Sequence, residues 1–501
     1  MDLFHNVGLG FAVALSWENL LCCVVGVLVG TLVGVLPGLG PAATISLLLP
    51  STYYLGPTPA VIMLAGVYYG AMYGGSTTSI LINIPGEAAS VVTCIDGYRM
   101  ARQGRAGPAL GISAFSSFIA GTLSVIGLCF AAPPLAKFAL GFGPPEYSAL
   151  IFLAFSVVAN LASQSILKGL MMIGAGIFLG CIGSDFITGD LRFTYGSITL
   201  FDGIGIVPVV IGLFGIAEVL ENMEVEAGKS DVLYAKLKGL FPTLKDWKES
   251  IPAIFRGTFL GFFLGILPGG SPIMASFASY ALEKRISKHP ENFGKGVIEG
   301  VAGPEAANNS ATGGCFIPLM TLGIPTNVVM ALMLGALMIH GIRPGPMFIQ
   351  EKPDLFFGFV ASMYLGNAML LILNLPLIPL WVRLLTIPYR LLFPLILLFC
   401  IIGVYSLNNN VWEIIIMLIF GIIGYLMRKF KYEAAPFVFA FILAPLIENS
   451  VRQSLLMSEG RFDIFFERPI SCVLTIAGFI MYLLTVIRWI KLRRKISYEF
   501  P

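Results

Sequence analysis

The chain has 501 residues, of which 57% are hydrophobic and 12% are charged. Soluble domains carry about 25% charged residues, so most of this chain must face lipid or other apolar segments. The formal net charge is only +3, which argues against a surface for nucleic acid. The eight cysteines are scattered and show no metal-ligand or redox spacing, so we interpret them as small buried hydrophobic residues.

A helix-breaking octapeptide ends the first apolar run, which lies near residues 11–33. It reads GVLPGLGP at residues 34–41 and returns as GILPGGSP at residues 265–272, with five of the eight positions identical. Non-helical backbone at membrane depth must line a cavity or be buried in protein, and paired interruptions point to a transporter's binding site. The alternative interpretation is a kink, or close packing of glycine-rich helices.

A helix that restarts after such a break presents free N–H groups and the positive end of its dipole, which suit a carboxylate. We therefore predict substrate contacts at both octapeptides. In the first copy the predicted residues are Pro37, Gly38, Leu39, Gly40, Pro41 and Thr44, and in the second they are Gly269, Gly270, Ser271 and Pro272.

A polar run follows each octapeptide, at residues 73–79 (YGGSTTS) and 308–313 (NNSATG), and each run leads to an Ile-Pro pair. Hydroxyls, amides and free backbone can hold a carboxylate by hydrogen bonds, or a sodium ion through oxygens, without a formal charge. The alternative is polar contact between membrane helices. The predicted substrate-binding residues are Gly74, Gly75, Ser76, Thr77, Thr78, Asn308, Asn309, Ser310, Thr312 and Thr326.

Basic residues are absent from both regions, because no Lys or Arg occurs at residues 1–98 or 296–342. An anion bound there would depend on dipoles, hydroxyls and a co-transported cation. We assign coupling to that cation, Na⁺ or H⁺, to Glu305 and Asn83, since carboxylates inside a membrane are usually functional. The alternative for Glu305 is an ordinary first-turn helix residue that follows a proline.

The remaining apolar spans, with the two interrupted segments, predict an all-α polytopic membrane protein of about 12 membrane segments. These spans lie near residues 108–134, 147–161, 165–183, 203–222, 355–378, 391–406, 411–427, 434–449 and 470–488.

The repeated motifs divide the chain into two membrane repeats with broken or re-entrant helices. The first repeat covers residues 1–223, a Lys- and Glu-rich cytoplasmic linker covers 224–250, and the second repeat with an extra C-terminal helix covers 251–501. Both flanks of the second octapeptide are basic, so that segment is predicted to form a re-entrant hairpin. Related pairs of broken helices in two halves are typical of secondary transporters.

Charge then predicts orientation. Basic clusters at residues 99–105, in the linker, at 428–431 and at 491–495 are cytoplasmic by the positive-inside rule. The loop at 184–202 is acidic although its counterpart at 428–433 is basic, so the two repeats are expected to have inverted topology. The N-terminus is then periplasmic and the C-terminus cytoplasmic.

Three runs resemble the large membrane subunit of tripartite tricarboxylate transporters. They are LPGLGP at 36–41, YGGSTTSIL at 73–81 with the following Pro85-Gly86-Glu87, and GPEAANN at 303–309. The resemblance extends over almost the whole chain. It implies a multi-pass carrier in a bacterial inner membrane, driven by an ion gradient and importing citrate-like di- or tricarboxylates. It also implies a small membrane subunit and a periplasmic solute-binding protein as partners, and carriers of this kind are often homodimers.

We therefore expect a secondary transporter with alternating access at a midplane site, with no enzyme activity and no cofactor besides the coupling cation. One alternative is a membrane channel, since broken helices can also line a pore. Another is a carrier for a different small anionic solute. An intramembrane enzyme would need a catalytic pair, but Asp185 and Asp190 lie in a loop and no His neighbours a motif Ser.

Overall fold

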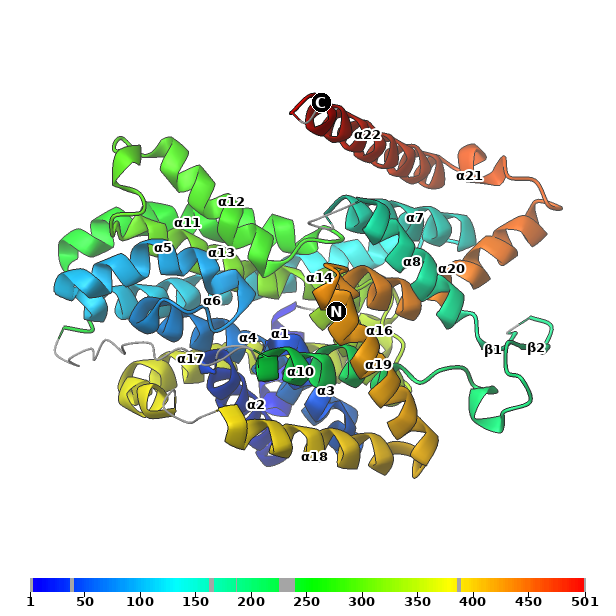
Figure 1. Cartoon of the computed structure of the whole chain (residues 1–501), viewed down its shortest axis with the longest axis horizontal. Helices are drawn as coiled ribbons and strands as arrows, with labels where there is room; N and C mark the ends of the chain where they lie inside the picture. Colours follow the sequence, from blue (N-terminus) through cyan, green and yellow to red (C-terminus); the bar gives the residue numbers. More distant parts are fainter. Residues whose placement is uncertain are drawn as a thin grey trace. The chain divides into compact units, whose positions relative to one another are not determined.

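A computed structural model of the chain describes residues 3–36, 40–161, 166–185, 187–224, 239–384 and 389–499. Within these ranges all regular secondary structure is helical, apart from one pair of two-residue strands (Figure 1). Seven of the described helices are long and apolar enough to cross a membrane, and five shorter apolar helices accompany them. The predicted all-α polytopic class is therefore confirmed.

The helices form two compact units, and each unit is built from two stretches of sequence. The first comprises Met1–Ala136 and Phe214–Asn410, and the second comprises Lys137–Leu213 and Val411–Pro501. Each unit thus draws on both predicted repeats, and none of the three boundaries between the units falls in the predicted linker. Residues 225–238 of that linker lie outside the described ranges. The division into repeats concerns sequence similarity and stays a prediction.

The first unit holds both octapeptides and both polar runs. It contains all or most of α1 (Leu3–Ala14), α2 (Trp17–Val35), α3 (Pro41–Thr52), α4 (Pro57–Ile82), η1 (Ala88–Ser90), α5 (Val91–Met100), η2 (Ala101–Arg105), α6 (Ala106–Ala139), α10 (Ala217–Glu224), α11 (Leu244–Ile266), α12 (Pro272–Ile286), η5 (Pro290–Asn292), α13 (Glu299–Gly314), α14 (Phe316–Leu322), α15 (Val328–Ile339), α16 (Phe348–Glu351), α17 (Pro353–Leu384) and α18 (Tyr389–Asn408).

The second unit is smaller and carries the only two strands among the described residues. Its elements are α7 (Pro144–Leu161), α8 (Ile166–Gly180), β1 (Gly183–Ser184), β2 (Leu191–Arg192), η3 (Ile198–Leu200), α9 (Ile206–Val210), η4 (Ile211–Ile216), α19 (Val411–Lys429), α20 (Ala434–Met457), α21 (Ile464–Glu467) and α22 (Pro469–Glu499).

Both octapeptides separate two helices, as the sequence predicts. Helix α2 ends at Val35 before α3 begins at Pro41, and α11 ends at Ile266 before α12 begins at Pro272. A proline fits the first position of a helix because its missing N–H has no intrahelical partner there. In the second break Gly269 adopts a left-handed backbone with φ of 75°, which glycine tolerates best.

Glycines with a spacing of four residues hold two equivalent helix pairs together. In α2, Gly30 packs so closely on α4 that a Cβ there would lie 2.5 Å from the Val67 carbonyl oxygen. In α11, a Cβ at Gly261 would lie 2.1 Å from the carbonyl oxygen of Ala307 in α13. Small residues at such spacing allow membrane helices to approach closely. These glycines of α2 and α11 therefore serve close helix packing.

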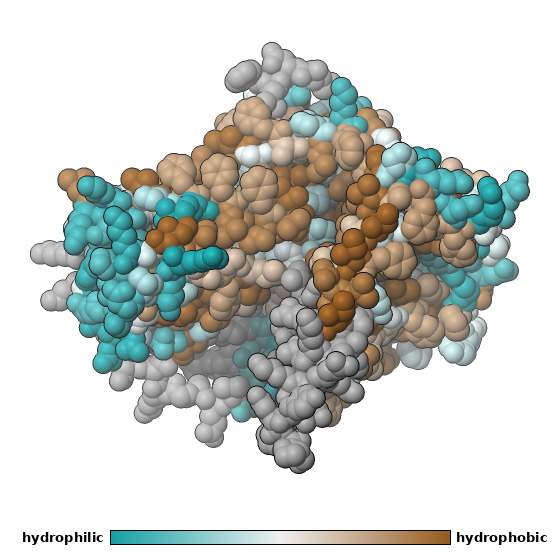
Figure 2. Space-filling view, turned by 90° about the horizontal axis from the view of Figure 1, so that it is seen from above, coloured by the Kyte–Doolittle hydropathy of each residue, from teal (hydrophilic) through white to brown (hydrophobic). Residues whose placement is uncertain are grey.

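Helix α11 also shows how the apolar surface arises. The face opposite its glycines carries Phe255, Phe259 and Phe263, which are 48%, 66% and 61% exposed. Hydrophobic side chains likewise gather over much of the face shown in Figure 2. Large exposed aromatic side chains on a helix of membrane-spanning length are typical of contact with lipid.

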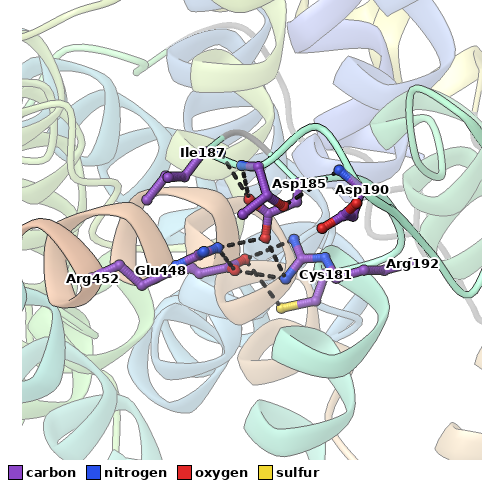
Figure 3. A network of polar contacts seen from close by, with 8 residues as sticks. Cys181, Asp185, Ile187, Asp190, Arg192, Glu448 and Arg452 are labelled. Carbon is purple, nitrogen blue, oxygen red and sulfur yellow. Dashed lines mark hydrogen bonds and ion pairs between the residues drawn. The ribbon is translucent and has the colours of Figure 1, made fainter.

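An ion network in the second unit ties the β1–β2 hairpin to α20 (Figure 3). Asp185 accepts hydrogen bonds from the backbone N–H groups of Ile187 and Thr188, and it pairs with Arg452 of α20. Arg192 of β2 donates two hydrogen bonds to Glu448, at 2.6 and 3.1 Å. The Thr188 N–H and the Arg452 guanidinium lower the pKa of Asp185 below its ordinary value, so this carboxylate is held as the anion.

Glycine packing in the first unit can be tested by Gly261→Ala. The added Cβ meets a backbone oxygen that cannot move alone, and overpacking of this kind costs about 1–3 kcal/mol. We expect a lower thermal midpoint in detergent. Gly174→Ala in α8 is the matched control, because nothing lies within 4 Å of its Cβ position. Equal midpoints for the two variants would contradict the packing role.

The hairpin network can be tested by Arg452→Gln together with a pH series. Since the folded-state pKa of Asp185 is lowered, its contribution is present above the unfolded value of ~3.9 and disappears as the pH falls through the lower folded value. Hydrogen exchange at the Ile187 and Thr188 amides, corrected for intrinsic rates, should therefore stay slow to about pH 4 in the unmodified chain. In the Arg452→Gln variant the protection should be weaker and should vanish at higher pH. An unchanged profile would show that Arg452 does not stabilise the hairpin.

Candidate functional site

The candidate site is a buried polar cluster around Glu305. This residue lies in the second turn of α13, after Pro304, and its side chain is fully buried, with 0% exposure. Glu305 is therefore a buried second-turn residue, and not the first-turn helix residue of the alternative interpretation. A carboxylate in this position has lost its hydration, which costs several kcal/mol unless other groups replace the water.

Four side chains from four helices provide donors to the Glu305 carboxylate. Ser76 of α4 donates to Oε2 at 2.7 Å, and Thr93 of α5 donates to Oε1. Ser117 of α6 and Asn308 of α13 approach Oε2 at 3.5 Å. Because the donors come from α4, α5, α6 and α13, the carboxylate joins the elements on either side of the predicted linker.

Asn309 extends the cluster one step further. Its amide nitrogen donates to Ser117 Oγ at 2.8 Å and to the backbone carbonyl of Glu305 at 3.0 Å. Ser76, Asn308, Asn309 and Glu305 were all predicted from the sequence as site residues, and the structure brings them together. Thr93 and Ser117 were not predicted.

The electrostatics of the cluster are unusual. No ion pair to Glu305 occurs among the described residues, and its neighbours there are hydroxyls and amides. A second carboxylate, Glu87, is also buried, and it accepts a hydrogen bond from the Ala89 N–H. Without a basic partner, such a carboxylate is stabilised best by a proton or a bound cation.

The cluster can therefore supply oxygen ligands but not a transition-metal site. Hard cations take oxygen ligands, whereas zinc and similar metals prefer nitrogen and sulfur. In the part of the chain that the structure describes, no group of three or more His, Cys, Asp or Glu side chains could hold a metal ion. The groups around Glu305 are carboxylate, hydroxyl and amide oxygens, the ligand type that hard cations take.

Other residues of the polar runs lie in helices and not in free backbone, which corrects the expectation for both runs. Helix α4 continues through Gly74 and Gly75, so their N–H groups are used within the helix. Gly74 packs against α2, and Gly75 leaves room for the Glu87 side chain. Thr78 donates to the Gly75 carbonyl within the same helix.

The remaining predicted polar residues have other partners or line small cavities. Ser310 donates to the carbonyl of Thr258 in α11 at 2.7 Å, which is a contact between helices. Thr77 and Thr312 line two small cavities beside the cluster. Thr326 is fully buried, and its hydroxyl has no hydrogen-bond partner among the described residues.

The backbone donors of the second break are used internally, contrary to the expectation that they are free. Gly269 N–H donates to the Thr326 carbonyl at 2.8 Å, and Gly270 N–H donates to Leu267 at 2.8 Å. Ser271 caps α12 by accepting from the Met274 N–H, and Pro272 begins that helix. The break is thus closed by the protein itself in this conformation.

In the first break, Pro37, Gly38 and Leu39 lie outside the described residues. Gly40 N–H donates to Glu218 Oε1 at 3.2 Å, so a carboxylate of the protein occupies the N-terminus of α3, which begins at Pro41. Thr44 donates to the Gly40 carbonyl. A carboxylate at this helix terminus agrees with the electrostatic preference that motivated the prediction, although the carboxylate is internal.

Asn83 does not join the cluster by any hydrogen bond among the described residues. It is exposed and takes the left-handed C-cap position of α4, with φ of 59°. Gly323 takes the equivalent position after α14, with φ of 69°, and an Ile-Pro pair follows both. Asparagine tolerates this backbone better than most residues, so helix termination accounts for its presence.

The fold and the cluster define an all-α polytopic membrane protein with a buried carboxylate in its larger unit. The chain belongs to the tripartite tricarboxylate transporter TctA family, whose model matches residues 20–439. It is therefore a membrane component of a tripartite transport system, which implies that it is not an enzyme.

Two proteins of Agrobacterium vitis are similar to the chain. The "Uncharacterized 52.8 kDa protein in TAR-I ttuC' 3'region" is 50% identical over 494 residues, which is 99% of this chain and 98% of that protein. The "Uncharacterized protein in TAR-II ttuC' 3'region" is 49% identical over 234 residues, which is 47% of this chain and 97% of that protein. No solved structure matches the chain.

The donor set of Glu305 can be tested by Thr93→Val. This change keeps the side-chain shape but removes a hydroxyl that satisfies a buried carboxylate, so we expect a loss of about 1–3 kcal/mol of stability. Thermal unfolding in detergent measures it. Thr31→Val is the control, because the buried Thr31 hydroxyl donates only to a carbonyl of its own helix. If Thr93→Val were as stable as the Thr31→Val control, the hydrogen bond assigned between Thr93 and Glu305 would be contradicted.

Proposed function

We propose that the chain is the ion-coupled carrier subunit that imports organic di- or tricarboxylates across a bacterial inner membrane. A periplasmic solute-binding protein would deliver the solute, and a small membrane subunit would complete the transporter. The observation that supports this proposal most directly is the fully buried Glu305, which has four hydroxyl or amide donors and no ion pair in the described chain.

The cation explains how an anionic solute could be carried without arginine or lysine. A proton or Na⁺ on Glu305 would cancel the negative charge of the cluster before the carboxylate solute arrives. Solute and cation would then stabilise each other, since opposite charges attract strongly in a medium of low dielectric constant. Coupling follows because neither ligand binds well alone.

Alternating access also fits the broken helices. Each break separates two helices, and discontinuous helices in transporters form the substrate and ion sites at which access alternates. The hydrogen bond from Gly269 to Thr326 and that from Gly40 to Glu218 are the contacts that would have to open. A solute carboxylate would replace Glu218 at the N-terminus of α3.

A channel is the second candidate, because interrupted helices can line a pore. Flux separates the two functions: a carrier saturates and needs its coupling ion, whereas a channel does neither.

The test is uptake of labelled citrate-like carboxylates by proteoliposomes that contain the chain, its small membrane subunit and the binding protein. We expect saturable uptake driven by a Na⁺ or pH gradient. Glu305→Gln should abolish the dependence on the gradient, because the amide cannot exchange a proton and binds a cation weakly. Ser76→Ala combined with Asn309→Ala should lower uptake at least tenfold, the effect of ~1.4 kcal/mol.

Ser148→Ala in α7 is the control, because this buried hydroxyl donates only to a carbonyl in its own helix. Uptake by Glu305→Gln with the ion dependence of the unmodified chain would refute coupling at this residue. Unchanged uptake by the Ser76 and Asn309 double variant would refute the cluster as part of the transport site.

A further inference from the structure

Buried polar side chains line one face of each of three helices in the first unit. On each helix their spacing is close to a multiple of 3.6 residues, so they share a face. We call this set the polar seam, and it consists of Tyr69, Tyr73 and Thr77 of α4, Ser113, Ser117 and Ser124 of α6, and Asn367 and Asn374 of α17. Burying so many polar groups in a membrane protein is costly and is usually tied to function.

The seam encloses two small chambers. One, of about 20 Å³, is lined by Tyr69, Ser124 and Asn367 together with Asn309 and Thr312 of α13. Because Asn309 belongs to the Glu305 cluster, this chamber adjoins the proposed cation site.

The other chamber, of about 10 Å³, is lined by Tyr73, Thr77, Ser113 and Asn374. Each chamber has room for about one water molecule, which is far too little for a carboxylate solute.

One hydrogen bond lies between the chambers. Tyr73, in the wall of the smaller chamber, donates its hydroxyl to Asn367 Oδ1 at 2.6 Å, and Asn367 is in the wall of the larger one. The Asn367 amide nitrogen in turn donates to the Phe118 carbonyl at 2.9 Å and to Thr122 Oγ1 at 3.0 Å, both in α6. A single side chain of α17 thus joins α4 to α6.

One residue in the wall of each chamber has a buried polar atom without a hydrogen-bond partner. Tyr69 lines the larger chamber and Asn374 the smaller one, and neither the Tyr69 hydroxyl nor Asn374 Oδ1 has a hydrogen bond within the described chain. Both side chains are more than nine-tenths buried, at 6% and 5% exposure. An unsatisfied buried polar atom costs about 1–3 kcal/mol, so its retention needs a reason.

We propose that the polar seam is the path of the oxygen-rich anionic solute and that the hydrogen bond from Tyr73 to Asn367 is its gate. The inference rests on the proposed transport function. The two chambers are the closed form of one path, and the unpartnered Tyr69 and Asn374 atoms meet the solute when the path opens. Glu305 then holds the cation on the α13 side of the seam while the solute passes between α4, α6 and α17.

The gate can be tested by Tyr73→Phe, which keeps the ring in place and removes only the hydroxyl. Proteoliposomes are loaded with labelled citrate, and efflux is followed without an ion gradient and without the binding protein. We expect efflux about tenfold faster than from the unmodified chain, which corresponds to ~1.4 kcal/mol. Ser46→Ala in α3 is the control, because this buried hydroxyl donates to the Ala43 carbonyl of its own helix. Equal efflux from Tyr73→Phe and the unmodified chain would overturn the gate.

A second measurement does not need the solute. Ser113→Cys and Ser124→Cys place one thiol in each chamber, and a membrane-impermeant thiol reagent is applied with and without Tyr73→Phe. The rate is compared with that of the same protein without the added cysteine. An opened gate should raise labelling of both thiols about tenfold, the same ~1.4 kcal/mol shift. Unchanged labelling would mean that the seam holds structural polar contacts only.

The two measurements also separate this proposal from the proposed function. If the unmodified chain transports citrate-like solutes but Tyr73→Phe changes neither efflux nor labelling, the gate is wrong and the transport function stands. If no carboxylate is transported yet labelling rises with Tyr73→Phe, the seam is a gated path and the assigned substrate class is wrong.

Discussion

The buried carboxylate of Glu305 is the constraint on which the candidate site depends. Its full burial removes the hydration of a charge, and the described neighbours replace the lost water only with hydroxyls and amides. Such an arrangement is stable in its anionic form only while every donor is in place, so α4, α5, α6 and α13 must keep their positions together. Binding or release of a cation at Glu305 would change the strength of the hydrogen bonds that join it to all four helices. Ion coupling requires such a link between cation binding and helix positions.

Helices α4 and α13 each use one face for close packing and another face for the polar groups of the Glu305 cluster. The packing of the first face positions the groups on the second. One face of each packs on glycines, with Val67 against Gly30 and Ala307 against Gly261. The other face carries the polar groups, with Ser76 on α4 and Glu305 on α13. Close packing on these small residues brings the helix backbones together, because a Cβ at Gly30 or Gly261 would overlap the backbone of the neighbouring helix. The frame that holds the cluster is therefore made of backbone contacts.

Local sequence predicted the helices well, because apolar runs and proline or glycine punctuation are local properties. The span expected near 411–427 is α19, and that near 434–449 lies within α20, which runs further to Met457. Ser76 and Glu305 could be selected because polar residues stand out in apolar sequence. Thr93 could not, since it meets Glu305 across 212 positions of sequence and is a lone hydroxyl within an apolar stretch.

The role of the breaks was less accessible from sequence. Proline and glycine at 268–270 led to the expectation of free donors, and this was wrong for Gly269 and Gly270. The acceptor for the Gly269 N–H is the carbonyl of Thr326, which lies far along the chain and could not be predicted from local sequence. Asn83 was predicted to take part in ion coupling because of its amide. Its left-handed backbone at the end of α4 accounts for an asparagine at this position instead. The α6 part of the seam had a usable signal, since Ser113, Ser117 and Ser124 repeat at helical spacing within an apolar span.

The most direct test of the central claim is infrared difference spectroscopy on the reconstituted chain, with and without the coupling cation and a carboxylate solute. If Glu305 is the coupling group, a carboxyl band should change when Na⁺ or H⁺ is added, and solute should sharpen that response. The change should be absent in Glu305→Gln. If no carboxyl band changed when the cation was added, or if the cation-dependent change persisted in Glu305→Gln, the account would be contradicted.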